Sequence, residues 1–214
     1  MLLTLLACGL VETETEHAAL VEDGPFAHVE IELGAGDVVV RGDPEATGAD
    51  GTFTATFSET PPAIEHWVDD GVLHVEGACV AIQAVCELSL AVTLPADVSV
   101  TIATGSGDAV VEGIVGDLVA ESGTGDVTAR GLAGYAELKT GSGDVCAESE
   151  GFDRIEAETG SGDIVVTVPP GVYALTAESG SGDVDVAPDV RSDGAAEAVI
   201  VAQTGSGDVS ILVP

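Results

Sequence analysis

The chain has 214 residues, enough for one ordinary domain or two small ones. Its 38 acidic and 5 basic residues give a formal net charge of −33, which argues against nucleic acid and anionic lipid headgroups as ligands, because phosphates attract Lys and Arg. Hydrophobic residues make up 45% of the chain, so it is not a disordered acidic tail, but aromatic residues make up only 3%. The core must therefore be thin and built of Val, Ala, Ile and Leu.

The chain begins with MLLTLLACGL, an apolar run that leads to Cys8. The four residues at 5–8, LLAC, resemble the lipobox of bacterial lipoprotein signals, which are cleaved before the cysteine that then carries lipid. The run is shorter than the roughly 20 apolar residues that span a membrane, and no basic residue precedes it, unlike most export signals. We expect residues 1–7 to be a lipoprotein-type signal segment and Cys8 to be the lipid attachment site. The alternative is an apolar chain end with an ordinary cysteine.

Residues 8–24 include the acidic stretch VETETEH, which shows no apolar period, and are expected to form a tether. Residues 25–100 are expected to be a β-rich N-terminal part that caps the repeats that follow, because short apolar segments alternate there with turn signals such as GAG, GDP and DDG. The aromatic residues of this part should seal the end of the stack, since exposed strand edges need covering. A ligand pocket is the alternative place for the single Trp. The expected strands are 26–33, 37–41, 52–57, 72–76 and 88–94, and the sealing residues are Phe53, Phe57, Trp67 and Val72.

Three further cysteines follow Cys8. Cys79 and Cys86 are seven residues apart and are expected to form a disulfide if the protein is exported, which leaves Cys146 as a free thiol. No CxxC pair occurs and the four His are scattered, so no metal site is expected.

One phrase recurs six times from residue 104 onward: TGSGD at 104–108, SGTGD at 122–126, TGSGD at 140–144 and 159–163, SGSGD at 179–183 and TGSGD at 204–208. The spacings of its aspartates are 18, 18, 19, 20 and 25 residues, and a period near 18–20 is typical of a solenoid. Asp37, in GAGD, belongs to an earlier relative of the phrase, 71 residues before Asp108. The repeated aspartates are Asp108, Asp126, Asp144, Asp163, Asp183 and Asp208.

Apolar residues alternate on both sides of each phrase. They occupy the first and third positions after the Asp, and the third and fifth positions before the first Gly. This period of two indicates strands with one face inward. Residues 101–214 are therefore predicted to be an all-β parallel β-solenoid, in which each coil of about 18–20 residues consists of a strand, a GSGD corner, a strand and a return loop. Residues 187–198 form the loop behind the spacing of 25.

The corner explains its own composition. Gly permits positive φ and close approach of neighbouring backbones, and Asp can accept a hydrogen bond from a backbone N–H of its own turn. Stacked carboxylates about 4.8 Å apart repel by roughly 0.9 kcal/mol even in bulk water, so backbone hydrogen bonds or bound cations must offset the repulsion. We interpret these residues as structural turn aspartates with loosely associated cations. The alternative, a calcium-binding β-roll, is disfavoured because Asp follows GSG without the intervening residue of the GGxGxDxUx repeat. A phosphate loop is excluded because neither Lys nor a helix pattern follows, and no cofactor is expected.

The order of these features resembles a bacterial family known chiefly by its repeat, whose members are named putative adhesins of unknown function. The resemblance rests on GAGDVVV at 34–40, DGVLHVEG at 70–77, LAVTLPADVSVTIATGSGD at 90–108 and the later coils, and it covers about residues 26–214. It implies a β-solenoid on an exported or membrane-anchored chain. It implies no catalytic residues.

These observations favour a non-enzymatic, exported protein of the cell envelope, anchored to the membrane by lipid, with a rigid acidic face for an envelope protein or a glycan. An envelope-stress or signalling accessory module is the second reading. A polysaccharide-active β-helix enzyme is disfavoured, because such enzymes line a groove with aromatic and basic residues, and because identical corners cannot supply the two different environments of an acid–base pair.

Overall fold

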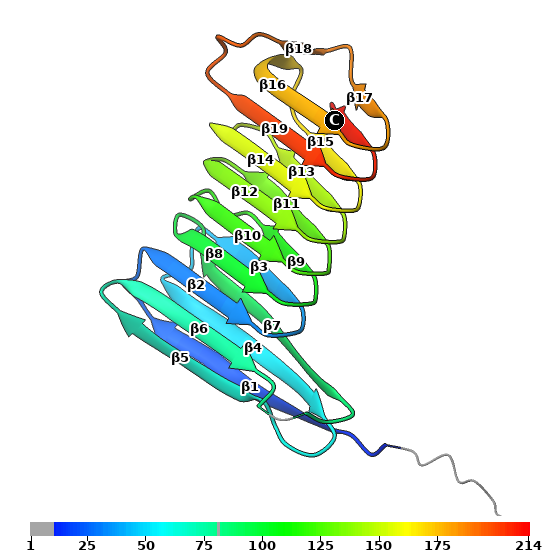
Figure 1. The fold of residues 1–214 in the computed structure, drawn as a ribbon. Helices are drawn as coiled ribbons and strands as arrows, with labels where there is room; N and C mark the ends of the chain where they lie inside the picture. The colour runs from blue at the N-terminus through cyan, green and yellow to red at the C-terminus, as the bar shows by residue number, and fades with distance from the viewer. Residues whose placement is uncertain (1–10, 81) are drawn as a thin grey trace, which may run out of the picture.

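The structure is a computed structural model that describes residues 11–80 and 82–214, and every regular element in this part of the chain is a β-strand. Twenty strands form two sheets of ten, which face each other along one column (Figure 1). Within the described residues there is no helix long and apolar enough to cross a membrane. The chain is therefore all-β, as the alternation of apolar residues predicts.

The first sheet, sheet A, contains in spatial order β1 (Glu14–Asp23), β4 (Gly48–Phe57), β7 (Cys86–Pro95), β3 (Val38–Asp43), β9 (Ala109–Glu112), β11 (Val127–Leu132), β13 (Val145–Ser149), β15 (Ile164–Thr167), β20 (Val209–Leu212) and β17 (Val184–Val186). The second sheet, sheet B, contains β18 (Val190–Ser192), β16 (Gly171–Ser179), β19 (Val199–Thr204), β14 (Arg154–Thr159), β12 (Tyr135–Thr140), β10 (Leu118–Ser122), β8 (Ser99–Thr104), β2 (His28–Leu33), β6 (Val72–Ala78) and β5 (Ala63–Asp69).

Each Gly-Asp phrase is a bend that carries the chain from a strand of sheet B to a strand of sheet A, and the bends lie along one side of the column (Figure 1). Neighbouring coils pair in parallel and place like residues over like. Leu118 of β10, for example, pairs with Val100 on one side and Ala136 on the other. Each interior strand is thus hydrogen-bonded on both edges, which removes the instability of an isolated pair of short strands.

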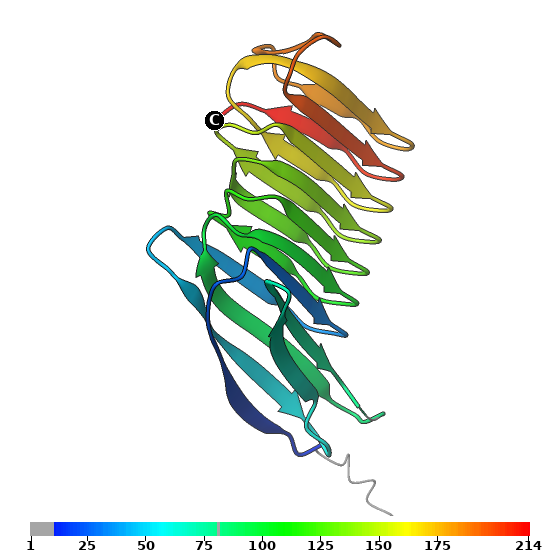
Figure 2. The ribbon, with the colours of Figure 1, turned by 90° about the vertical axis from the view of Figure 1, so that its left-hand side faces the viewer.

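The spatial order of the coils departs from their order in the sequence at both ends. The coil β19–β20 lies between β14–β15 and β16–β17, so the C-terminus is not at the end of the stack (Figures 1 and 2). In the same way, the coil β2–β3 lies between β6–β7 and β8–β9. The bend of Asp37 is therefore a full member of the stack and stands directly beside that of Asp108.

The prediction of a tether at residues 8–24 is wrong for most of its length, because Glu14–Asp23 forms β1, which pairs antiparallel with β4 over ten residues. Leu20 is its only buried residue, so the strand carries almost no periodic apolar signal. Its pairing is mostly backbone to backbone, with side-chain hydrogen bonds between Thr15 and Thr56 and between His17 and Thr54. The strand β5 was also not expected, and it pairs antiparallel with β6 at the same end of the column.

The inward positions predicted from the alternation are buried in five of the six repeats, for example Val145 and Ala147 at 0% exposure. The exception is the repeat at 175–186, which forms the outermost coil. At the other end Phe53 and Phe57 are buried, as predicted, whereas Trp67 is 38% exposed on the outer face of sheet B. Trp67 therefore does not seal the core. Val72 is half-buried.

Candidate functional site

The bends form a continuous rim along the column, and their glycines are required by the close stacking of the coils. At Gly143, φ is +149°, and an added Cβ would lie 2.2 Å from the carbonyl oxygen of Gly125 in the neighbouring coil. The Gly143 N–H donates to the carbonyl of Ser161 on its other side. Neighbouring bends are thus hydrogen-bonded backbone to backbone, at a distance that leaves no room for a side chain.

The carboxylates of the rim form a hydrogen-bonded ladder. The Asp144 N–H donates to Oδ1 of Asp126 over 2.8 Å, and the Asp163 N–H donates to Oδ1 of Asp144 over 2.8 Å. The prediction that each Asp accepts from its own turn is wrong: six of the seven accept from the N–H of the Asp in the next coil, and no group of the described residues donates to the carboxylate of Asp183. The six bonds join Asp108 to Asp37, Asp126 to Asp108, Asp144 to Asp126, Asp163 to Asp144, Asp208 to Asp163 and Asp183 to Asp208.

This geometry explains how the rim tolerates its charge. All seven aspartates are exposed, so water screens them, and the six that accept a hydrogen bond each receive a backbone N–H, whose dipole offsets part of the repulsion between neighbouring carboxylates. The described part of the chain contains no group of three or more His, Cys, Asp or Glu that could hold a metal ion. The rim thus offers an exposed row of carboxylates beside exposed Ser and Thr hydroxyls.

A second ladder, which the sequence reasoning missed, lies under the rim. The residue before the first Gly of each repeat is Thr or Ser, and its hydroxyl donates to the carbonyl of the second Gly in the neighbouring coil; Thr140, for example, donates to Gly125 over 2.8 Å. Repetition of a hydroxyl residue at this position was the available signal. The donors are Thr104, Ser122, Thr140, Thr159, Ser179 and Thr204. All of them except Ser179, in the outermost coil, are buried.

The coil β6–β7 lacks the phrase, and a disulfide closes its bend instead. Cys79 and Cys86 are joined, with Cα atoms 6.2 Å apart. In the same loop the Gln83 carboxamide accepts hydrogen bonds from the N–H groups of residues 58–60 and donates to the carbonyl of Thr60, which fixes the β4–β5 turn. Cys146 is a free thiol and half-buried on β13. Cys8, the expected lipid attachment site, lies outside the described residues.

The outer face of sheet B carries a group of aromatic and charged residues at its N-terminal end. Trp67 stacks on His74, with ring centroids 5.0 Å apart. His74 Nδ1 lies 3.0 Å from Glu30 Oε2, and His28 Nε2 lies 3.6 Å from the other oxygen of Glu30. The strand register brings these residues together from three neighbouring strands, β5, β6 and β2, although the sequence scatters them.

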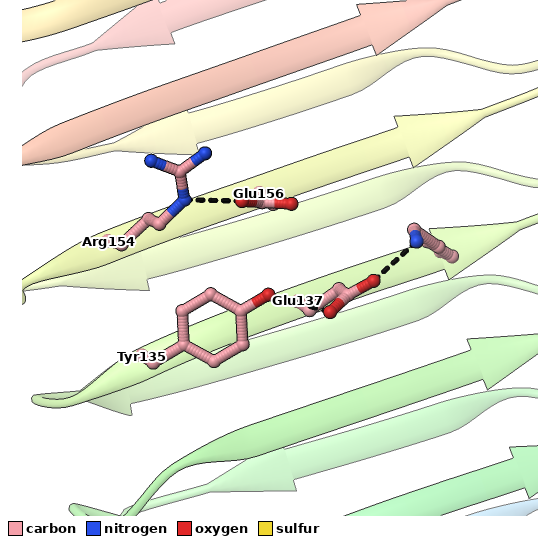
Figure 3. A network of polar contacts seen from close by, with 5 residues as sticks. Tyr135, Glu137, Arg154 and Glu156 are labelled. Atoms are coloured by element: carbon pink, nitrogen blue, oxygen red, sulfur yellow. Dashed lines mark hydrogen bonds and ion pairs between the residues drawn. The ribbon is translucent and has the colours of Figure 1, made fainter.

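A polar network occupies the same face in the middle of the stack (Figure 3). The Tyr135 hydroxyl donates to Glu137 Oε2 over 2.6 Å, and this bond, with burial, raises the pKa of Tyr135 to about 12. The pKa of Glu137 is lowered, mainly by the hydrogen bond that it accepts from Lys139 and also by the one from Tyr135. The hydrogen bond to Glu137 in turn raises the pKa of Lys139. On the next strand Arg154 donates to Glu156. These contacts neutralise part of an otherwise acidic face.

The family model described as Toastrack DUF4097 matches residues 91–212, more than half of the chain. The chain belongs to this family. The match begins within β7, so the coil of Asp37 lies before the matched part of this Toastrack chain. No curated protein matches it in sequence.

Solved structures resemble the Toastrack chain in fold. A crystal structure of a "putative cell adhesion protein" from Clostridium sporogenes has a TM-score of 0.57 and 16% identity over 94% of this chain and 100% of that one. A "putative adhesin" from Bacteroides fragilis has a TM-score of 0.43 and 11% identity over 94% of this chain and 97% of that one. At 16% identity the first likeness concerns the fold.

Proposed function

We propose that this Toastrack protein is a non-enzymatic, exported lipoprotein of the cell envelope that holds a rigid acidic surface for binding, in the manner of an adhesin. The observation that carries the proposal is the rim, where seven exposed carboxylates stand in one row on a backbone held by two ladders of hydrogen bonds. A row of like sites favours binding of an extended or multivalent partner, an envelope protein or a glycan. Catalysis would need differently placed groups, whereas every bend repeats the same environment.

The comparisons support a binding role. The fold is shared over nearly its whole length with the Clostridium sporogenes chain described as a "putative cell adhesion protein". We also propose that the period of about 18–20 residues is one coil, and that the antiparallel strands β1, β4 and β5 are the cap that blocks the N-terminal end of the stack.

The anchor follows from the sequence at 5–8 and fits the position of β1. Only five residues separate Cys8 from Glu14, the first residue of β1, so a lipid on Cys8 would hold that end of the column within about 20 Å of the membrane. Because sheet A contains ten strands about 4.8 Å apart, its far edge would project roughly 40 Å further. The coil β16–β17 would then be the part most distant from the membrane.

Acyl labelling in cells that express the full chain tests the anchor. The wild-type protein should incorporate a labelled fatty acid and sediment with membranes, and Cys8→Ser should lose both properties. Cys146→Ser is the matched control, since it removes the free thiol on β13 and should keep the label. A Cys8→Ser protein that remains lipidated would refute the anchor.

A further inference from the structure

The outermost coil, β16 with its bend and β17, leaves the end of the apolar column uncovered. Leu175 and Ala177 of β16 are half-buried, and Val184 of β17 is 44% exposed. The equivalent residues one coil further in, Ile200 and Ala202, are both 0% exposed. The inward face of this coil therefore lacks the layer that covers it everywhere else.

The backbone of β16 is also open on this side. Ala174 and Gly180 donate their N–H groups inward, to the carbonyls of Ala198 and Thr204. The N–H and C=O groups of successive residues in a strand point to opposite edges, so residues 175, 177 and 179 turn theirs outward. Earlier in the strand, the outward positions at 171 and 173 are occupied by hydrogen bonds with residues 189 and 193, on either side of β18. The free edge thus begins where β18 ends and runs to residue 179.

Both side-chain ladders stop at the same place. The Asp183 N–H donates to Asp208, but within the described residues no group donates to the carboxylate of Asp183. The carbonyl of Gly182 likewise accepts no hydroxyl, whereas that of Gly207 accepts from Ser179. The coil therefore presents the acceptors that a further strand and bend would satisfy.

At the opposite end of the column the apolar core is covered, although β1 and β5 are edge strands there. Phe53 of β4, the strand next to β1, is completely buried, and His66 Nε2 of β5 lies 3.5 Å from Glu22 Oε1 of β1. Aromatic residues cover only the return-loop half of the outermost coil, where Tyr173 stacks on Phe152. The bend half, over Leu175 and Ala177, has no such cover among the described residues.

The negative charge of the outermost coil indicates which kind of partner can bind its free edge. Glu178, Asp183 and Asp185 are all exposed there, on a chain of net charge −33. Two copies of the chain meeting through this edge would bring these carboxylates together, which disfavours self-association. A partner strand added to β16, with basic residues on the outer face of sheet B, would instead place those residues beside Glu178, while its apolar residues cover Leu175 and Ala177.

We propose that the free edge of β16, residues 174–179, binds an extended segment of a partner protein in which apolar and basic residues alternate, by addition of a strand to sheet B. The proposal deepens the binding role above and does not depend on the lipid anchor. It places the partner at the end of the column that an anchor on Cys8 would hold furthest from the membrane.

The test measures fluorescence anisotropy of a labelled peptide of about eight alternating Val and Lys residues with the purified protein at physiological salt. Saturable binding at one peptide per chain is expected. Ala177→Pro removes an outward N–H without removing an internal hydrogen bond, and proline is tolerated on edge strands, so affinity should fall at least tenfold. Glu178→Lys reverses the charge of a side chain of β16 on the solvent-exposed face of sheet B and should weaken binding at least fivefold.

Glu121→Lys is the matched control, because Glu121 occupies the equivalent exposed position on β10, four strands away and about 19 Å distant, beyond the screening length at this salt. It should change affinity less than twofold. A Val–Lys peptide methylated on alternate backbone nitrogens should also bind weakly. If Ala177→Pro loses its native melting transition, Glu178→Lys and the methylated peptide decide the question.

Two outcomes overturn the proposal. If the Val–Lys peptide does not bind, the edge is not a strand acceptor. If Glu121→Lys weakens binding as much as Glu178→Lys, and the methylated peptide binds as well as the parent, the attraction is diffuse. The edge proposal then fails, while binding through the acidic surface stands.

Discussion

Replacement of Thr140 by valine tests the buried hydroxyl ladder. Thr140 is 5% exposed, and its hydroxyl donates to the Gly125 carbonyl over 2.8 Å. Thr140→Val keeps the shape of the side chain but removes the donor, which costs about 1 kcal/mol for the hydrogen bond and about 1 kcal/mol or more for the unsatisfied carbonyl. Burial of the added methyl group returns about 0.8 kcal/mol. The net loss should be about 1–2 kcal/mol, which lowers the melting temperature by about 2–8 °C in a domain of this size.

Thermal unfolding followed by circular dichroism measures this shift. The matched control is Thr128→Val on β11, a half-buried position on the outward side of sheet A where the hydroxyl makes no hydrogen bond in the described structure. It should leave the melting temperature unchanged or slightly raised, because valine favours strands. If Thr140→Val and Thr128→Val melt within about one degree of each other, the ladder contributes no stability and the reasoning is refuted.

Three further outcomes are expected. Gly143→Ala should destabilise the protein by more than about 3 kcal/mol in urea unfolding, because its Cβ would collide with a neighbouring backbone carbonyl, whereas Gly151→Ala, with open space around the Cβ, should be nearly neutral; equal effects would contradict the close stacking. The phenolate absorbance of Tyr135 should appear near pH 12, and Glu137→Gln should move it toward 10. Since the folded pKa is above the unfolded one, the stability from Tyr135 is present below about pH 10 and lost as pH rises through about 12; an unshifted titration would count against the bond. In hydrogen exchange, amides of β20, paired on both edges, should exchange more slowly than those of β17, paired on one, and the reverse would contradict the coil order.

Most of the repeat architecture could be predicted because its signals are local. The alternation around each Asp identifies the inward residues, and the glycines identify the bends. Trp67 and β1 could not be predicted in this way. β1 has a single buried residue, Leu20, and is held mainly by backbone pairing with β4, which leaves no trace in the side-chain pattern. Trp67 is on the outer face because Ile64 and His66 take the inward positions of β5.

The order of the coils could not be read from the repeats because the repeats are nearly identical. Asp163 could have accepted from Asp183, the next in sequence, with the same local geometry that it has with Asp208. Only the return segments distinguish the two arrangements, through contacts such as that of Tyr173 with Phe152, and these segments carry no repeated pattern. The donor to each Asp carboxylate could not be predicted for the same reason: a stacked carboxylate has two N–H donors within reach, that of its own turn and that of the next coil.

The inserted coils at the two ends have a common consequence for the open edge. A chain whose last coil is also outermost can fray from its terminus, because one ladder of hydrogen bonds holds it and the loss of each residue frees the next. Here β20, the C-terminal strand, is held between β15 and β17, and the outermost coil is joined at both of its ends to the rest of the chain. To release that coil, sheet A and sheet B must open together while both connections remain in place. The outermost coil can therefore keep the unpaired edge of β16 and the half-buried residues Leu175 and Ala177 without fraying. A strand edge that is to bind a partner needs this stability in the unbound protein.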